Sequence, residues 1–216
     1  MADIFNEIDE ELRKDKAQEW WGRYGKFVIG ACVVVVAAAG GYTWFEQQRT
    51  AELRELADRY GHALTQADAG ETDPALAALQ SLSQEADGEG IAMIASFQRA
   101  GILADQDRHA EAAEVYATVA ADDSVDPLYR GLAELKAILH RSVAGDDTAA
   151  LLAEIEPLTL DGEPWRYSAR MVAASLAMGT GDMEKAKAYL TQVSDDDGAP
   201  NSARTQAVEI LQAIGS

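Results

Sequence analysis

One uncharged stretch of nineteen residues, 27–45, constrains the fold of this chain more than any other feature. A helix of that length rises about 28 Å, close to the roughly 30 Å thickness of the hydrocarbon core of a bilayer. The stretch is apolar on every face, which is unusual for a helix in a soluble domain. Aromatic residues of the kind that prefer the membrane interface lie at its two ends: Trp20, Trp21 and Tyr24 at one, and Tyr42, Trp44 and Phe45 at the other. The stretch therefore predicts a single transmembrane helix.

A cleaved signal peptide is the alternative interpretation of this stretch. Ala37, Ala38 and Ala39 are small residues that a signal peptidase accepts. However, 26 residues with seven acids and five bases precede the apolar stretch, and hydrophobicity resumes at residues 42–45. An uncleaved anchor fits this pattern better.

The basic residues near the span predict its orientation. Five lie shortly before it and three lie in a similar window after it: Arg13, Lys14, Lys16, Arg23 and Lys26, against Arg49, Arg54 and Arg59. Because basic residues are enriched on the cytoplasmic side, this bias places residues 1–26 in the cytoplasm and residues 46–216 across the membrane. In a bacterium, the protein is then a single-pass inner-membrane protein whose C-terminal domain is periplasmic.

The charge of residues 46–216 limits the partners of that domain. The whole chain has a net charge of −19, of which residues 46–216 carry −17. Such a field disfavours nucleic acid and anionic lipid and favours solubility or basic partners. The one cysteine, Cys32, lies inside the predicted span, so no intramolecular disulfide forms and packing must hold the domain together.

Residues 1–26 contain an amphipathic helical pattern. Ile4, Ile8 and Leu12 recur at intervals of four, which places them on one helix face. Two interpretations remain open for this segment: a docking helix for a partner, or a helix lying at the membrane interface before the span.

Beyond residue 64 the chain shows a repeated helix pair. Four second helices align on a small residue, which is Ala78, Ala112, Ala150 or Ala186, at intervals of 34, 38 and 36 residues. These intervals are close to the 34 residues of the tetratricopeptide repeat. Four positions later stand Leu82, Tyr116, Glu154 and Leu190, so the third unit is irregular, with Leu152 and Ile155 expected to take the inward role.

The first helices and the turns agree with this pattern. Ala100 and Ala174 each precede the aligned alanine by twelve residues, where the two helices of a pair cross closely. Gly181 and Asp182 suit the turn within the last pair, and Pro127 and Pro200 follow second helices. The sequence therefore predicts an all-α fold, with the single N-terminal transmembrane helix followed by a tetratricopeptide-repeat-like solenoid capped by residues 199–214.

No catalytic, cofactor or metal site is predicted. His62, His109 and His140 appear isolated, and the aspartate clusters at 122–126 and 195–197 lack the ligand spacing of a calcium loop. There is no phosphate-binding glycine loop and no nucleophile elbow. We therefore expect a binding protein rather than an enzyme.

Several basic residues are candidates for a peptide-binding groove. Arg130, Lys136 and Arg141 lie on one predicted helix, and Arg166 and Arg170 lie on a later one. They suit acidic side chains or a peptide carboxylate. Solvation, or pairing with the surplus acids, is the alternative for them. Trp165 and Tyr167 are the neighbouring aromatic candidates, with helix packing as their alternative.

The run DIFNEIDEELRKDKAQEWWGRYGKFVI, the single span and the helix pairs together resemble the YfgM-like family of proteobacterial membrane proteins. The resemblance implies an inner-membrane protein with a periplasmic helical domain. It also implies association with the SecYEG translocon and a membrane-anchored periplasmic chaperone, assisting nascent secretory proteins as they emerge.

Two other functions are compatible with the same sequence. One is a structural scaffold of envelope assembly or cell division that self-associates as a homo-oligomer. The other is a regulator whose cytoplasmic helix, through Ile4, Ile8 and Leu12, binds a signalling protein.

Overall fold

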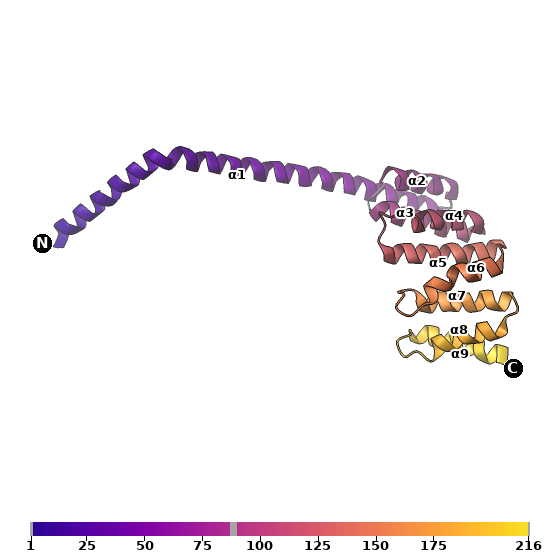
Figure 1. Ribbon diagram of the computed structural model, residues 1–216. Helices are drawn as coiled ribbons and strands as arrows, with labels where there is room; N and C mark the ends of the chain where they lie inside the picture. Colours follow the sequence, from indigo (N-terminus) through magenta and orange to yellow (C-terminus); the bar gives the residue numbers. More distant parts are fainter. Residues whose placement is uncertain (1, 87–89, 216) are drawn as a thin grey trace. The chain divides into compact units, whose positions relative to one another are not determined.

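The computed structural model describes residues 2–86 and 90–215; the side chains of residues 2–19, 28, 29 and 31–33 are outside this description. Ile4, Ile8, Leu12 and Cys32 are therefore outside the described side chains. All regular elements in the described ranges are helices, which confirms the all-α prediction (Figure 1). The chain divides into two compact units, Met1–Glu55 and Leu56–Ser216.

The first helix, α1, runs without interruption over Ala2–Asp68. Trp20, Trp21, Tyr24, Tyr42 and Trp44, predicted to lie at a membrane interface, are all exposed within this chain. Among the residues that the structure describes, no helix has a window both long and apolar enough to cross a membrane. Residues 28, 29 and 31–33 of the predicted span are not among those whose side chains are described.

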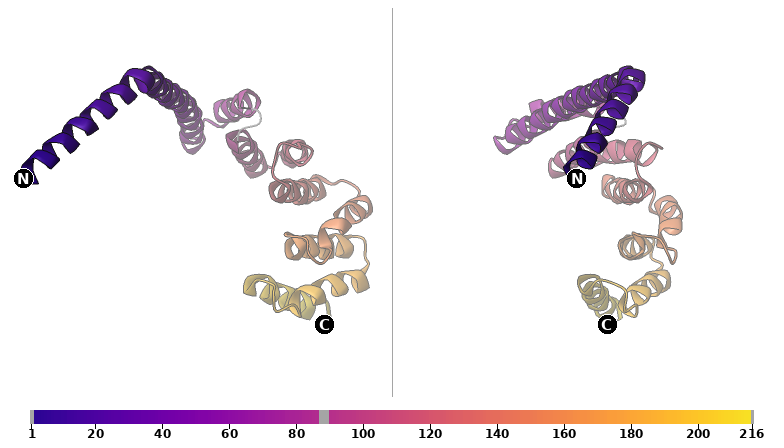
Figure 2. Two further views of the ribbon diagram at one scale, coloured as in Figure 1. Left: turned by 60° about the vertical axis from the view of Figure 1, so that its left-hand side comes forward. Right: turned by 90° about the vertical axis from the view of Figure 1, so that its left-hand side faces the viewer.

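The second unit is a stack of helix pairs in which consecutive helices lie side by side in chain order (Figure 2). The last turns of α1, from Leu56, pair with α2. The later pairs are α3 with α4, α5 with α6, and α7 with α8, and α9 closes the stack. The remaining helices are α2 (Thr72–Glu85), α3 (Gly90–Asp105), α4 (His109–Ala120), α5 (Pro127–Ala144), α6 (Thr148–Ile155), η1 (Glu156–Thr159), α7 (Arg166–Gly179), α8 (Met183–Ser194) and α9 (Asn201–Gly215).

The turns within the four pairs share one backbone geometry. Each has a residue with positive φ near the end of the first helix: Gly70, Asp107, Gly145 and Gly181. In each, the next N–H donates to a carbonyl five residues back: Glu71 to Gln66, Arg108 to Leu103, Asp146 to Arg141 and Asp182 to Ala177. This bond and the left-handed residue define a Schellman motif. The predicted turn at Gly181 and Asp182 is therefore found, and three other turns match it.

Each second helix buries its fourth residue. These residues are Ala75, Ala112, Leu151 and Ala186, all fully buried, and four positions later come Leu79, Tyr116, Ile155 and Leu190, also buried. The predicted inward role of Ala150 is therefore wrong, since it is exposed, whereas Ala78 is half-buried and packs against the hydrophobic core. Ala100 and Ala174 of the first helices are fully buried.

The third pair is irregular because of Pro157. Proline lacks an N–H and clashes with the preceding turn, so an α-helix does not continue through it. Here α6 ends at Ile155 and a 3₁₀ turn, η1, follows. Pro127, in contrast, starts α5 behind the N-cap Asp126, whose side chain accepts a hydrogen bond from the Leu128 N–H.

The core of this unit consists of two hydrophobic clusters that meet at α5. Ala133 and Ala137 belong to the cluster built by the end of α1 with α2, α3 and α4. Leu135 and Ile138 belong to the cluster built with α6, η1, α7, α8 and α9. A fully buried leucine or isoleucine contributes roughly 2–3 kcal/mol through burial. Because α5 contributes buried side chains to both clusters, it links the two halves of the stack.

Candidate protein-interaction surface

The basic residues predicted to line a groove do not converge on one. Arg130 pairs with Asp123, Nη1 to Oδ1 at 2.5 Å, at the start of α5. The Lys136 ammonium lies 5.6 Å from the centre of the Tyr116 ring. Arg141 pairs with Asp146 and Glu154, and these two partners raise the pKa of its guanidinium. All three bases are engaged within the chain.

Arg166 and Arg170 make contacts that fix the loops beside α7, and Arg170 also lines an open pocket together with Lys185 and Tyr189 of α8. Arg170 is 5 % exposed, and it donates to the Thr159 carbonyl and to Asp161. Arg166 lies over the Tyr167 ring, and the Tyr167 hydroxyl donates to Asp196. The Gly198 N–H and then the Tyr167 hydroxyl hold the pKa of the Asp196 carboxyl below its usual value. These contacts connect α7 to the loops on either side of it.

Trp165 also packs within the stack. Its Nε1 donates to the Leu128 carbonyl at 2.8 Å, and its ring lies against Gly131 of α5. A side chain at position 131 would crowd that ring, so the glycine allows this close contact. The indole therefore joins the start of α7 to the start of α5.

Two histidines that appear isolated in the sequence meet in the structure. His109 of α4 and His140 of α5 stack, with their Nδ1 atoms 3.2 Å apart. Tyr116 stacks on His140, and Phe97 contacts the edge of Tyr116. The prediction of isolated histidines was wrong for these two, because residues 31 positions apart are brought together by helix packing. Within the described part of the chain, no group of three histidine, cysteine or acidic residues could hold a metal ion.

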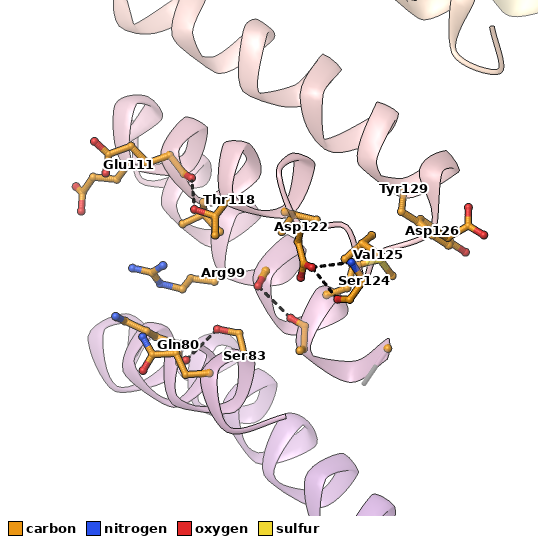
Figure 3. Close-up of a pocket in the computed structure, with 18 residues that line it drawn as sticks. Gln80, Ser83, Arg99, Glu111, Thr118, Asp122, Ser124, Val125, Asp126 and Tyr129 are labelled. Carbon is orange, nitrogen blue, oxygen red and sulfur yellow. Dashed lines mark hydrogen bonds between the residues drawn. The ribbon is translucent and has the colours of Figure 1, made fainter. Parts of the chain in front are cut away.

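An open cleft lies between α2, α4 and the start of α5, with α3 between them (Figure 3). Its volume is about 700 Å³, within the usual range of ligand-binding clefts. Its lining includes Gln80 and Ser83 on α2, Met93 and Arg99 on α3, Glu111, Glu114, Val115 and Thr118 on α4, Asp122, Val125 and Asp126 in the following loop, and Tyr129 on α5. We refer to it as the α2–α4 cleft.

The α2–α4 cleft combines acidic and apolar walls. Its lining includes four acids, Glu111, Glu114, Asp122 and Asp126, and one base, Arg99. Arg99 extends between Gln80 of α2 and Glu111 of α4 (Figure 3). Hydrogen bonds from Arg108, aided by Arg99, lower the pKa of Glu111 and keep it ionised. Met93, Val115, Val125 and Tyr129 supply the apolar surface. Such a lining suits a ligand that has both apolar and cationic groups.

No pattern in the sequence predicted this cleft. Its residues come from four helices and a loop, and none belongs to a motif. The basic residues were singled out because they contrast with an acidic chain, whereas the cleft is formed mainly by ordinary polar and acidic side chains.

One family model matches this chain. Residues 18–163, about two thirds of the sequence, match the model described as a tetratricopeptide repeat-like domain. The matched region includes the apolar stretch 27–45 as well as the first three helix pairs. No curated protein and no solved structure matches the chain.

Proposed function

The chain belongs to the tetratricopeptide repeat-like domain family, and from that premise we propose that it is a membrane-anchored scaffold that binds other proteins. Domains of this kind are protein-interaction modules, because stacked helix pairs present an extended surface. This part of the proposal rests on the family and on the repeated turns and core positions described above.

The anchor is proposed from the nineteen uncharged residues at 27–45. The large apolar side chains described in this stretch are exposed: Val34 and Val35 are each 66 % exposed, and Val36 is 71 % exposed. An extended apolar surface of this kind calls for a covering from outside the chain, and a bilayer provides it. The bias in basic residues supports a periplasmic location for residues 46–216 in this proposal.

The proposed partners are the SecYEG translocon and a membrane-anchored periplasmic chaperone. Support comes from the resemblance of residues 3–29, the apolar stretch and the helix pairs to the YfgM-like family. In this role the scaffold assists nascent secretory proteins as they emerge. A tether raises the local concentration of the helical domain near the channel, so weak contacts suffice.

Affinity purification of the tagged full-length chain in mild detergent, followed by mass spectrometry, tests the partners. The comparison is a shortened chain that begins at Gln47 and is exported by a cleavable signal. We expect translocon subunits with the full-length chain and none with the shortened one. Recovery of division or cell-wall proteins instead would favour the envelope-scaffold function.

Alkaline extraction of membranes tests the anchor separately. The full-length chain should remain in the membrane pellet, whereas Val35→Arg, in the middle of the apolar stretch, should move part of it to the supernatant. Val208→Arg, which adds the same charge on an exposed position of α9, is the matched control. Release of the unaltered chain by alkali would exclude the anchor.

A further inference from the structure

We propose that the α2–α4 cleft binds an extended peptide segment of a protein partner in which lysine or arginine residues are interspersed with apolar residues. The inference rests on the proposed scaffold function, and it adds the site and the chemistry of the bound segment. The carboxylates and apolar side chains of the cleft support it, as does the Arg99 Nε, which has no hydrogen-bond partner among the described residues.

Glu114 is the carboxylate best placed for a cation of the partner. The other three are engaged: Glu111 accepts two hydrogen bonds from Arg108, Asp122 accepts from Ser124, and Asp126 caps α5. Among the described residues, the Glu114 carboxylate accepts no hydrogen bond, and its residue is exposed. A lysine or arginine of the partner therefore pairs with Glu114 without displacing an existing contact.

Whereas Glu114 needs a cation from the partner, Arg99 needs a hydrogen-bond acceptor. Its Nε is buried and has no hydrogen-bond partner among the described residues. A buried donor without an acceptor is unfavourable. Backbone carbonyl oxygens of an extended peptide in the cleft can accept hydrogen bonds from the terminal N–H groups of this guanidinium.

The apolar side chains of the cleft favour a bound peptide that also contains apolar residues. Met93 is half-buried and Val115 is 9 % exposed, and they lie on α3 and α4 beside the acidic groups. In an extended backbone with a basic residue at every third position, each face presents both basic and apolar side chains, and the apolar ones can contact this wall. The net charge of −19 also attracts basic segments over acidic ones.

Fluorescence anisotropy with three labelled peptides tests the inference. The full-length chain is held in nanodiscs of phosphatidylcholine, and the signal from empty nanodiscs is subtracted. The probes are the peptides AVKAVKAV, AVEAVEAV and AVQAVQAV. We expect the lysine peptide to bind about tenfold more tightly than the glutamate peptide, and the difference should decrease with added salt.

Charge reversal locates the binding site. Glu114→Lys should weaken binding of the lysine peptide about tenfold and improve that of the glutamate peptide. Glu209→Lys makes the same change on an exposed position of α9 and should leave both affinities unchanged. Thr118→Trp fills the cleft and should weaken binding of all three peptides, whereas Thr205→Trp on α9 should not. Circular dichroism checks that each variant is folded.

Equal binding of the lysine and glutamate peptides, or no binding of any, would overturn the inference. The same holds if Glu209→Lys acts like Glu114→Lys, or if Thr205→Trp acts like Thr118→Trp. Preferred binding of the glutamine peptide would show an apolar site instead.

The outcome is independent of the translocon experiment. If no translocon subunit is recovered but the lysine peptide binds in the cleft, the proposed partners are wrong and the cleft remains a peptide site. If translocon subunits are recovered and Glu114→Lys binds peptides normally, only the cleft assignment fails.

Discussion

Asp107 adopts a backbone conformation that glycine adopts in the other three turns of the helix pairs. Its φ is 59°, against 83°, 95° and 80° at Gly70, Gly145 and Gly181. Asp107→Gly should therefore raise the free energy of unfolding by about 0.5 kcal/mol, since the relief of strain exceeds the added freedom of the unfolded chain. Gly181→Ala should lower it by about 1 kcal/mol. Urea denaturation measures both, and changes of the same sign would contradict the shared geometry.

The histidine stack predicts a pH-dependent stability. Burial, then His109 and Lys136, lower the pKa of His140 below 6.5 in the folded chain. The unfolded chain therefore binds the proton more readily, so the contribution is fully present above pH 6.5 and is lost as the pH falls from there to the folded pKa. Within that window the loss is about 1.4 kcal/mol per pH unit at most. Urea midpoints at pH 7.5 and 5.5 measure it.

His140→Phe keeps an aromatic ring against Tyr116 and should reduce this pH dependence. His62→Phe, at an exposed position of α1, is the control and should retain it. Burial raises the pKa of Glu134, which acts in the opposite direction, so the comparison between the two variants is the relevant quantity. Equal slopes in both would refute the role of His140.

At the scale of single residues, the sequence indicated some positions and not others. Gly181 and Asp182 were predictable because glycine and aspartate suit a left-handed residue followed by an N-cap. Asp107 was not, since aspartate has no strong preference for positive φ. The contact between His109 and His140 depends on how two helices pack, which no local pattern records.

Among the elements, α5 has the most demanding position because it contributes to both hydrophobic clusters. Ile138 is fully buried, while the next residue, Leu139, is 40 % exposed. Ile138→Ala should lower the free energy of unfolding by roughly 2–5 kcal/mol, and Leu139→Ala by less than about 1 kcal/mol. Thermal or urea unfolding measures the difference. Similar losses at both positions would mean that α5 is rotated relative to its position here.

The second helices were predictable as elements, but their inward faces were only partly so. In α2, alanines at 75, 77 and 78 offer several small residues, and alignment alone selected Ala78 over the buried Ala75. In α6, Ala150 was preferred to Leu151 because a small residue was expected at this position. The shared turn geometry determines the register in both cases, and it is invisible until the backbone is known.

At the scale of the second unit, α9 serves as the cap of the stack. Ala207 is fully buried, and Ile210, Leu211 and Ile214 pack against the hydrophobic cluster that α5 forms with α6, η1, α7 and α8. Removing residues 201–216 should lower the stability of that cluster by roughly 3 kcal/mol, because its apolar surface becomes exposed. Hydrogen exchange should show faster exchange in α7 and α8 and little change in α3.

Val208→Ser, at an exposed position of α9, is the control for that truncation and should leave exchange unchanged. A uniform acceleration from α2 to α8 would show instead that the two clusters unfold as one cooperative unit.

The all-α class and the pairing of helices followed from periodicity, whereas the α2–α4 cleft did not. Hydrophobic spacing identifies which side of a helix is buried, but it does not report how far apart two helices lie across a third. The cleft is formed by that separation, and its acidic residues resemble those of any solvated helix face.

The four Schellman turns have a further consequence for how this chain can vary. Their hydrogen bonds join main-chain atoms only, and the residue with positive φ is glycine in three and aspartate in one. The unit that recurs is therefore a backbone template, on which side chains can be exchanged while the hairpin keeps its geometry. Divergent copies of such a hairpin are recognised more reliably by their backbone torsion angles than by their amino-acid sequences.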